Sequence, residues 1–398
     1  MPSLAQHLPL RRTASPTRWT IVGATVLTAD NGLVPDATVT IEDRLIEQVS
    51  SAVPSGSTTI DAHGLLLLPG IIDVHGDAFE RALAPRPGVH LPALMALAEN
   101  DAWLLASGIT TFFCSITDSY EPGLRSRAQA RELVNLLHGD ARNHFAVKHR
   151  VHLRHELCLT DGHEELRGWL EGGLIHLLST ADHLPKEGDE RKRQRYLHSV
   201  ARRSTSSGEE LEHMMRVAAA NRTLGHVQEF ELAQHARRLG IPLASHDDDS
   251  VGMVQESLAR GVAICEFPMD IASARAAQDG GALVLMGAPN WVRGGSHIGA
   301  MGVKEALADN VLGALCSDYH YPSLFHAPFL LEARAKVPLG DAWAMVSEHP
   351  ARAVGLGHCL GRIAAGYEAD FLLVEPVVNG MPRLRHVFVG GREVARYG

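Results

Sequence analysis

Both ends of the chain carry short apolar segments rich in β-branched residues and separated by turn residues. They lie at residues 20–27, 37–41 and 45–49, and again at 369–374 and 387–394. Runs of this kind, bounded by Asp, Asn and Gly, are typical of β-strands joined by tight turns. The two β-rich ends flank a long middle of different character. The pattern therefore predicts one small β-sandwich domain built from both termini, at residues 18–66 and 360–398.

The middle of the chain, residues 67–359, alternates short apolar runs with stretches of helical pattern. The runs predicted as strands are 70–74, 109–115, 150–158, 174–179, 242–245, 264–267, 283–286 and 312–317. Eight strands alternating with helices are what a closed parallel (β/α)₈ barrel requires. The expected fold class is α/β, a TIM barrel beside the small β-sandwich. In such barrels the chemistry lies at the carboxyl ends of the strands.

Composition narrows the class of protein without changing this fold. The 398 residues carry a net charge of −9, which is unfavourable for binding nucleic acid or an anionic membrane surface. No apolar run approaches the length of a transmembrane helix, and the five cysteines are scattered. These features argue against a disulfide framework and a zinc ribbon, and they favour a cytoplasmic protein. Residues 1–17 are expected to be a disordered leader.

Acidic and imidazole side chains gather where the predicted strands end. Six of them follow five strands: His75, Asp77, Glu156, His183, His246 and Asp318. A lone His-x-Asp pair would most often be a surface turn, and polar groups inside a barrel can form a purely structural salt bridge. The joint placement of six such groups is better explained by a divalent metal site. Nitrogen and oxygen ligands without thiolate suit zinc, which we expect, and also manganese, iron or nickel.

Asp318, after the last strand, is expected to be both a metal ligand and the general base. A metal ion lowers the pKa of a bound water toward neutrality, and a neighbouring carboxylate can take the proton. Two points stay open from the sequence. Glu156 could bridge two ions, or His152, which shares its strand face, could be the ligand instead.

A glycine-rich stretch between the last two strands carries groups suited to binding an anion. They are Asn290, Arg293, Gly294, Gly295, Ser296 and His297. Glycines let backbone N–H groups approach an anion, and arginine can bind phosphate oxygens through two nitrogens. Arg81, Arg86 and Arg154 add positive charge near the same mouth. We therefore expect a small anionic, phosphorylated substrate; an ordinary glycine-rich turn is the alternative interpretation.

A strongly charged region precedes the fifth predicted strand. Residues 186–212 are rich in charged side chains, and 191–203 are strongly basic. A solvated helix or loop explains this most simply. A mobile lid whose arginines meet an anionic substrate is the functional alternative.

Several segments resemble signatures of the amidohydrolase superfamily. Residues 68–75 resemble its first-strand signature, and 348–356 with 361–371 resemble its tail signature. Within that superfamily, the chain is similar to the α-D-ribose 1-methylphosphonate 5-triphosphate diphosphatase family of the carbon–phosphorus lyase pathway. The segments that carry this similarity are 75–77, 84–88, 152–156, 182–183, 244–248, 266–268, 286–290, 293–297 and 317–319. The resemblance implies a metal-dependent-hydrolase barrel with a terminal β-sandwich.

The resemblance also implies a reaction: hydrolysis of a triphosphate arm to release pyrophosphate, leaving the 5-phosphate. Activated water would attack the phosphorus nearest the ribose, with Asp318 as base. The charge on the phosphate chain would be neutralised by the arginines Arg81, Arg86, Arg154 and Arg293. One loop departs from the family's pattern, because residues 184–191 replace an expected Pro-Gly-Gln-rich continuation. A related phosphorylated or phosphonate compound is therefore an alternative substrate.

Two functions of other kinds remain as alternatives. The same fold could hydrolyse a C–N bond of a cyclic amide or N-acyl substrate, as most of the superfamily does. A metal-free relative could act as a scaffold, although the six candidate ligands argue against it. A homo-oligomeric assembly is compatible with each of these functions.

Overall fold

The computed structural model describes residues 18–86, 88–185, 188–201, 204, 206–295, 301–378 and 381–398. The expected leader, residues 1–17, lies outside the described residues. Two compact units divide the chain: residues up to Leu68 together with Ile363–Gly398, and Pro69–Arg362. Among the described residues, no helix combines the length and apolar character needed to cross a bilayer.

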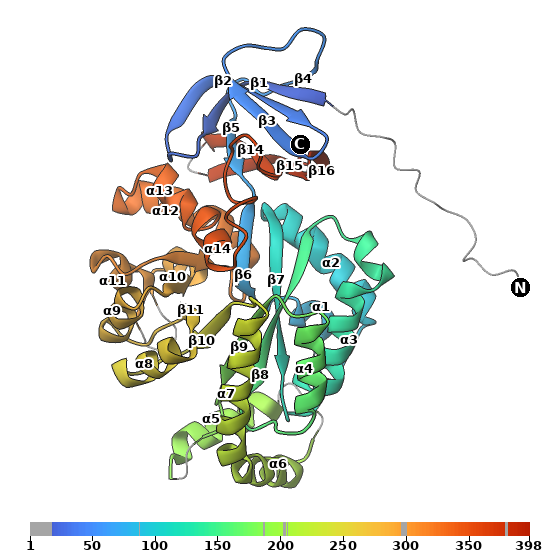
Figure 1. Ribbon diagram of the computed structural model, residues 1–398, viewed down its shortest axis with the longest axis vertical. Helices are drawn as coiled ribbons and strands as arrows, with labels where there is room; N and C mark the ends of the chain where they lie inside the picture. The colour runs from blue at the N-terminus through green and yellow to red at the C-terminus, as the bar shows by residue number, and fades with distance from the viewer. Residues whose placement is uncertain are drawn as a thin grey trace, which may run out of the picture. The chain divides into compact units, whose positions relative to one another are not determined.

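The smaller unit is one β-sheet built from both ends of the chain (Figure 1). Its strands are β1 (Arg18–Leu27), β2 (Leu33–Glu42), β3 (Leu45–Ser50), β4 (Thr58–Asp61), β5 (Leu66–Pro69), β14 (Phe371–Val378), β15 (Met381–Val389) and β16 (Arg392–Arg396). The order is β16-β15-β14-β5-β1-β2-β3, with β4 beside β1. The Trp19 and Phe388 rings stack at 5.3 Å, although β5 and β14 separate their strands in the sheet. The sheet therefore coils around a shared core, which is how the predicted sandwich is realised.

One predicted strand of this unit proved to be a hairpin. Residues 387–394 span the end of β15, a turn and the start of β16. Gly390 and Gly391 form the turn with φ of 53° and 72°. Left-handed conformation at both central residues gives a two-residue turn whose twist matches the flanking strands. The apolar pattern continues across the turn, so periodicity alone did not reveal the break.

The larger unit is a barrel of eight parallel strands, as predicted. They are β6 (Ile71–Gly76), β7 (Ile109–Asp118), β8 (Lys148–Glu156), β9 (Leu177–Ala181), β10 (Leu243–His246), β11 (Val262–Glu266), β12 (Leu283–Gly287) and β13 (Ala314–Cys316). Each pairs with its neighbour in chain order. Inward apolar residues such as Ile72, Phe113 and Leu285 fill a shared core at 0–1% exposure. The predicted α/β barrel with a β-rich domain from both termini is confirmed.

The barrel closes through main-chain atoms where β6 and β13 end. The amide of Asp318 donates to the carbonyl of His75 at 3.0 Å, and the amide of Asp77 donates to the carbonyl of Asp318 at 2.9 Å. The side chain of Asp73 adds to the seam by accepting hydrogen bonds from the amide and hydroxyl of Ser317. The closing seam therefore lies at the end of the barrel where the candidate functional residues are.

Several helices of this unit begin or end at capping residues that can be recognised in the sequence. They are α1 (Glu80–Leu83), α2 (Ala93–Ala106), α3 (Arg127–His138), α4 (His163–Glu171), α5 (Glu190–Ala201), α6 (Gly208–Ala220), α7 (Arg222–Arg238), α8 (Val251–Arg260), α9 (Ile271–Asp279), α10 (Ala288–Arg293), α11 (Val303–Ala308), α12 (Tyr321–Ala335), α13 (Leu339–Ala344) and α14 (Glu348–Ala353), with 3₁₀ turns at Gly123–Arg125 and Asp140–His144. Ser126, Ser250 and Asp270 cap α3, α8 and α9 by accepting hydrogen bonds from backbone amides. Gly261 ends α8 with a φ of 90°.

The described residues of the charged region form helix α5 and the start of α6, the first two of three helices between β9 and β10. Figure 1 shows α5 and α6 beyond the ends of β8 and β9. The Tyr196 hydroxyl donates to the Tyr120 hydroxyl at 3.2 Å, and Val200 is fully buried. The helix is therefore anchored to the strand ends by one face, while its basic residues Arg191 and Arg195 are exposed.

A buried ion-pair network ties β7 to β8 and α3. Asp118, which has no exposed surface, accepts hydrogen bonds from Arg127 and from Nδ1 of His155 at 2.7 Å. Burial by itself raises the pKa of Asp118, but the bonds from His155 and Arg127 outweigh it and hold the pKa below its ordinary value. The ionised carboxylate is therefore the form that stabilises the fold.

Asp118→Asn is expected to lower the free energy of unfolding by about 3–5 kcal/mol at neutral pH, because Arg127 then loses its buried partner. Urea denaturation followed by circular dichroism measures this. The lowered folded-state pKa means that the stabilisation is present above pH ~4 and lost as pH falls through the folded-state pKa. The difference between the two proteins should accordingly shrink in acid. Glu164→Gln, which touches the half-exposed Arg167, is the control and should cost at most about 1 kcal/mol.

Candidate metal centre

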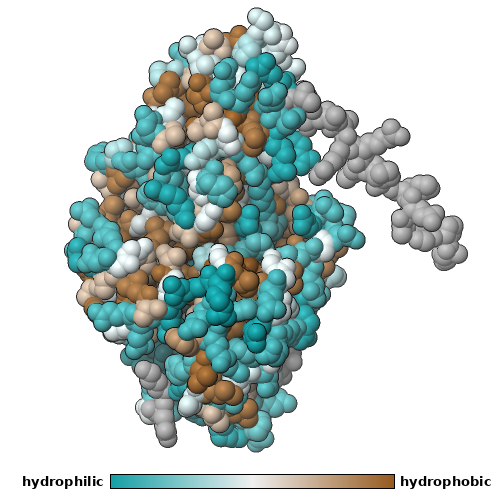
Figure 2. Space-filling model, viewed as in Figure 1, coloured by the Kyte–Doolittle hydropathy of each residue, from teal (hydrophilic) through white to brown (hydrophobic). Residues whose placement is uncertain are grey.

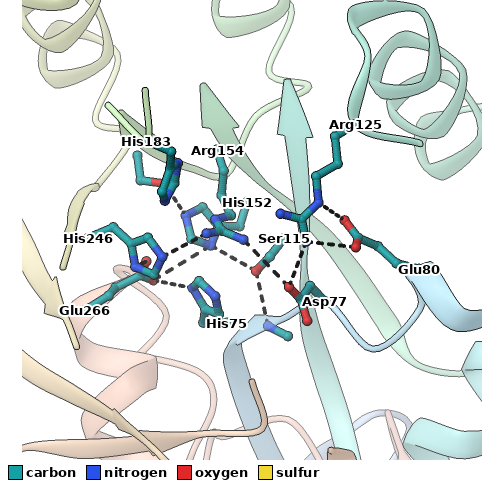
Figure 3. A network of polar contacts seen from close by, with 12 residues as sticks. His75, Asp77, Glu80, Ser115, Arg125, His152, Arg154, His183, His246 and Glu266 are labelled. Atoms are coloured by element: carbon teal, nitrogen blue, oxygen red, sulfur yellow. Dashed lines mark hydrogen bonds and ion pairs between the residues drawn. The ribbon is translucent and has the colours of Figure 1, made fainter. Parts of the chain in front are cut away.

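Two histidines and one glutamate converge at the carboxyl ends of three barrel strands. His75, His246 and Glu266 come from β6, β10 and β11 (Figure 3). Nδ1 of His75 lies 3.0 Å from one Glu266 oxygen, and Nδ1 of His246 lies 3.8 Å from the other. Both nitrogens and both carboxylate oxygens are buried and have no hydrogen-bond partner among the described residues. Unpartnered buried polar atoms are costly, so their convergence calls for a ligand.

Backbone conformation places these side chains at the strand ends. Asp247 and Phe267, which follow His246 and Glu266, have φ of 56° and 53°. A non-glycine residue in this left-handed region costs on the order of 1–2 kcal/mol. The Phe267 ring compensates by packing edge-on against the rings of His75 and His246 at 5.1 and 5.3 Å. The strained turns thus end the strands and fix both imidazoles.

Burial disfavours charge on all three groups. It lowers the pKa of His75 to about 3, with Arg154 adding to the effect, and it raises the pKa of Glu266 to about 7. Burial also lowers the pKa of His246 well below its ordinary range. Two neutral imidazoles beside a desolvated carboxylate form a donor set that suits zinc and the other borderline divalent ions. The residues present therefore fit a divalent cation.

His152 forms a group of possible ligands with His75 and Glu266, in which the donor atoms all lie within 4.8 Å of one another, but both of its nitrogens are engaged in hydrogen bonds. It is fully buried, and its Nδ1 lies 3.9 Å from a Glu266 oxygen. Nδ1 donates to the carbonyl of Val74 at 3.2 Å, while Nε2 accepts from the Ser179 hydroxyl at 2.9 Å. A carbonyl oxygen can only accept, so the proton resides on Nδ1. His152 is therefore a neutral, hydrogen-bonded imidazole that packs next to the site.

A second group of possible ligands comprises His183, His246 and Asp247, whose donor atoms all lie within 4.8 Å of one another. Glu156 lies beside it, and its carboxylate accepts from both the ring and the amide nitrogen of His183. The Glu156 charge raises the pKa of His183. Burial alone would raise the pKa of Glu156, but His183 outweighs it and lowers that pKa. In this arrangement the Glu156 carboxylate positions the His183 ring by accepting its hydrogen bonds.

Asp77 faces two arginines. Its carboxylate lies 3.4 Å from Nη2 of Arg125 and 3.8 Å from Nη1 of Arg154. Arg154 in turn donates a hydrogen bond to Nε2 of His246 at 2.8 Å. Figure 3 shows Arg154 among His152, His183 and His246, and Arg125 beside Glu80. Asp77 is thus part of an ion-pair chain and of neither group of possible ligands.

Asp318 is held by its backbone at the closing seam with a φ of 54°. Its carboxylate has no recorded hydrogen bond or ion pair within the described parts of the chain, and it lies outside both ligand groups. Burial raises the pKa of Asp318 to about 7, and the neighbouring Asp77 adds to the rise. A carboxylate that is unengaged and titrates near neutrality is suited to accept a proton.

The glycine-rich stretch proved to contain a short helix. Residues Ala288–Arg293 form α10, and Gly294 ends it with a φ of 93°. The Asn290 side-chain oxygen is buried and has no hydrogen-bond partner among the residues that the structure describes. Arg293 is exposed, and its Nη2 donates to the carbonyl of Gly295 at 3.2 Å. The remaining two predicted anion-binding residues, Ser296 and His297, lie outside the described residues.

Sequence reasoning did not select Glu266 or Phe267 as functional residues. A signal was present, because Glu266 is the one acidic residue at the end of an otherwise apolar run. Glu266 has no exposed surface in the structure. Burying a carboxylate without a partner is energetically costly, so its presence there indicates a function.

Comparisons with known proteins match the chain to one hydrolase family and to one relative along most of its length. Residues 189–394 match the Amidohydrolase family. The α-D-ribose 1-methylphosphonate 5-triphosphate diphosphatase of Escherichia coli (strain K12) is 32% identical over 365 residues, which cover 89% of this chain and 93% of that protein.

Two solved structures share the fold. N-acetylglucosamine-6-phosphate deacetylase from Pasteurella multocida has a TM-score of 0.64 at 12% identity, covering 95% of this chain and 100% of its own. Dihydropyrimidinase from Brevibacillus agri NCHU1002 has a TM-score of 0.61 at 15% identity, covering 95% of both chains. At such identities the likeness shows the fold alone. The family match and the full-length relative go further: the chain is a hydrolase that belongs to the amidohydrolase family.

Proposed function

We propose that the protein is a metal-dependent diphosphatase that cleaves the triphosphate arm of α-D-ribose 1-methylphosphonate 5-triphosphate, or of a closely related ribosyl triphosphate, and releases pyrophosphate. The observation that carries the proposal is the buried His75–Glu266–His246 cluster, whose Nδ1 atoms and carboxylate oxygens have no hydrogen-bond partner in the described parts of the chain. The 32% identical diphosphatase supports the choice of bond and substrate class.

His75, His246 and Glu266 would hold the cation. His183 and Asp247, which form a group of possible ligands with His246, would lie at its rim. A bound divalent ion would supply Lewis-acid activation of a water and of a phosphoryl oxygen. Zinc is the ion we expect, and manganese, iron or nickel fit the same donor set. Asp77 and Glu156, the other carboxylates expected from the sequence, are engaged by arginine and by His183.

Arg154 would be freed for the substrate when His246 acts as a ligand. A neutral imidazole has one lone pair and one proton. If Nε2 coordinates, its lone pair is used; if Nδ1 coordinates, Nε2 carries the proton. In either case Nε2 can no longer accept the hydrogen bond from Arg154. Arg154 keeps Asp77 as a neighbour and gains a guanidinium face for phosphate oxygens.

Asp318 would accept the proton of the attacking water. The water oxygen bonds to the phosphorus nearest the ribose, and the bond from that phosphorus to the bridging oxygen breaks. The electron pair leaves with the two terminal phosphates as pyrophosphate, and the 5-phosphate stays on the ribose. Asp318 is suited to this step by its raised pKa and its unengaged carboxylate.

Pyrophosphate release from ribosyl triphosphates, measured together with metal content, tests the proposal. His246→Ala is expected to lower both bound metal and turnover. His226→Ala, which removes an exposed histidine on α7, should change neither. Full metal content and full turnover in the His246 variant would contradict the ligand assignment. Hydrolysis of amides without any pyrophosphate release would favour a C–N hydrolase instead.

Arg293→Ala is expected to raise KM about tenfold while the bound metal is retained, because a hydrogen bond between charged partners contributes roughly 1.5–3 kcal/mol. Steady-state kinetics with metal quantification measures this. The exposed Arg334 offers a matched control, since it lies in the last turn of α12, at the end of the helix that is farther from Asp318 in sequence. An unchanged KM in the Arg293 variant would remove this residue from the substrate site.

A further inference from the structure

A cavity of about 410 Å³ opens beside the metal centre, between the segment after β6 and helix α5. Arg81, Arg86 and His90 line it from the first segment, and His198 and Ser199 line it from α5. Its volume lies within the range of about 300–1,000 Å³ typical of small-ligand pockets. Leu124, from the 3₁₀ turn after β7, completes the lining, so three segments far apart in the sequence build this cavity.

The charge of the cavity is positive. Its one acidic lining residue, Glu80, is neutralised by Arg125, whose Nε and Nη2 both donate to its carboxylate at 2.8 Å. Arg81 and Arg86 are exposed, and no carboxylate partner is recorded for either within the described parts of the chain. Two uncompensated guanidinium groups and two histidines therefore face a space large enough for an anion.

A continuous set of ion pairs joins the cavity to the metal centre. Arg125 binds Glu80 at the cavity wall and also lies 3.4 Å from Asp77. Asp77 neighbours Arg154, which contacts His246. Figure 3 shows this chain running from Glu80 past Asp77 toward the histidines. The cavity is thus adjacent to the centre yet removed from its carboxylates, which repel anions.

We propose that this cavity is the subsite for the two terminal phosphates of the substrate, with His198 of α5 as a specificity-determining residue. The inference rests on the proposed function and adds a location for the leaving pyrophosphate. Arg81 and Arg86 would bind its oxygens, and His198 would contact it across the cavity.

Calorimetric titration of the metal-loaded protein with inorganic pyrophosphate tests the subsite. The double variant Arg81→Met/Arg86→Met is expected to weaken pyrophosphate binding by at least about tenfold, from the loss of charge-assisted hydrogen bonds. His198→Ala should weaken it less, by about threefold or more, as expected for one hydrogen bond. Metal content should be unchanged in both. Arg81→Lys/Arg86→Lys should restore part of the affinity, and His213→Ala, which lies outside the cavity, should leave it unchanged.

The outcomes separate this inference from the proposed function. Unchanged pyrophosphate affinity in the Arg81/Arg86 double variant would overturn the subsite even if triphosphate hydrolysis is found. Arginine-dependent pyrophosphate binding without triphosphate hydrolysis would uphold the subsite and overturn the proposed reaction. Absence of pyrophosphate binding in the unaltered protein would overturn the subsite. A rise in KM with little change in kcat for His198→Ala would support its role in recognition.

Discussion

Replacing Glu266 by glutamine is expected to abolish tight metal binding and to lower kcat/KM by about 10³-fold, because a ligating carboxylate contributes several kcal/mol of charge stabilisation. Glutamine keeps the size of the side chain and removes its charge. Metal quantification after dialysis and a pyrophosphate-release assay measure the two effects. Glu256→Gln on the exposed face of α8 is the matched control and should leave both unchanged.

The same substitution should not destabilise the metal-free protein. Both Glu266 oxygens are buried, and neither has a hydrogen-bond partner within the described part of the chain, so ionising this residue is costly in the absence of a cation. Chemical denaturation of metal-free samples should give the Gln variant a free energy of unfolding equal to or above that of the unaltered protein. A large loss of stability together with retained metal would show that Glu266 is structural and would refute its assignment as a ligand.

Asp318→Asn is expected to lower kcat by about 10²- to 10⁴-fold, the usual contribution of a general base. Asparagine preserves the shape of the side chain and tolerates the left-handed backbone at this position. Because the closing hydrogen bonds use main-chain atoms of Asp318, the barrel should remain closed. Single-turnover measurements on metal-loaded protein would separate this chemical step from substrate binding.

Metal content distinguishes the roles open to Asp318. Retained metal with lost turnover supports the base, whereas loss of metal would make the residue a ligand. Asp309→Asn, in a half-exposed pair with Arg275, serves as the control and should behave like the unaltered protein. Full turnover in the Asp318 variant would rule out both roles.

The barrel could be predicted from the sequence because most of its strands are nearly continuous apolar runs; β8, which is rich in charged and imidazole residues, is the exception. Parallel strands buried on both faces give such runs, and all eight were found within a few residues of their observed bounds. The hairpin at Gly390-Gly391 was missed because apolar residues continue on both sides of the turn. The form of the charged region was left open between helix and loop; its described residues form helix α5 and the start of α6.

The apolar runs that mark the strands also predicted part of the candidate site. His75 and His246 end apolar runs, so their position at the barrel mouth was predictable. Glu266 was not chosen because the apolar pattern extends to Phe267, which placed the glutamate inside the predicted strand 264–267. The left-handed turn at Phe267 ends the strand one residue earlier.

The choice of partners could not be read from the sequence. Asp77 meets Arg125, which lies 48 positions away in a 3₁₀ turn after β7. Such a contact depends on how far a long side chain reaches across two loops, and no local pattern encodes that distance. The pairing of Glu156 with His183 likewise depends on the course of the loop after β9.

The main-chain seam between His75, Asp77 and Asp318 affects which side chains can be replaced during the evolution of this barrel. The hydrogen bonds that join His75, Asp77 and Asp318 use only their carbonyl and amide groups, so these bonds can form whatever side chains the three positions carry. Substitutions that change the chemistry of these side chains can therefore arise in evolution with less loss of stability than such changes usually cause. Only Asp318 is restricted, to residues that accept a left-handed backbone.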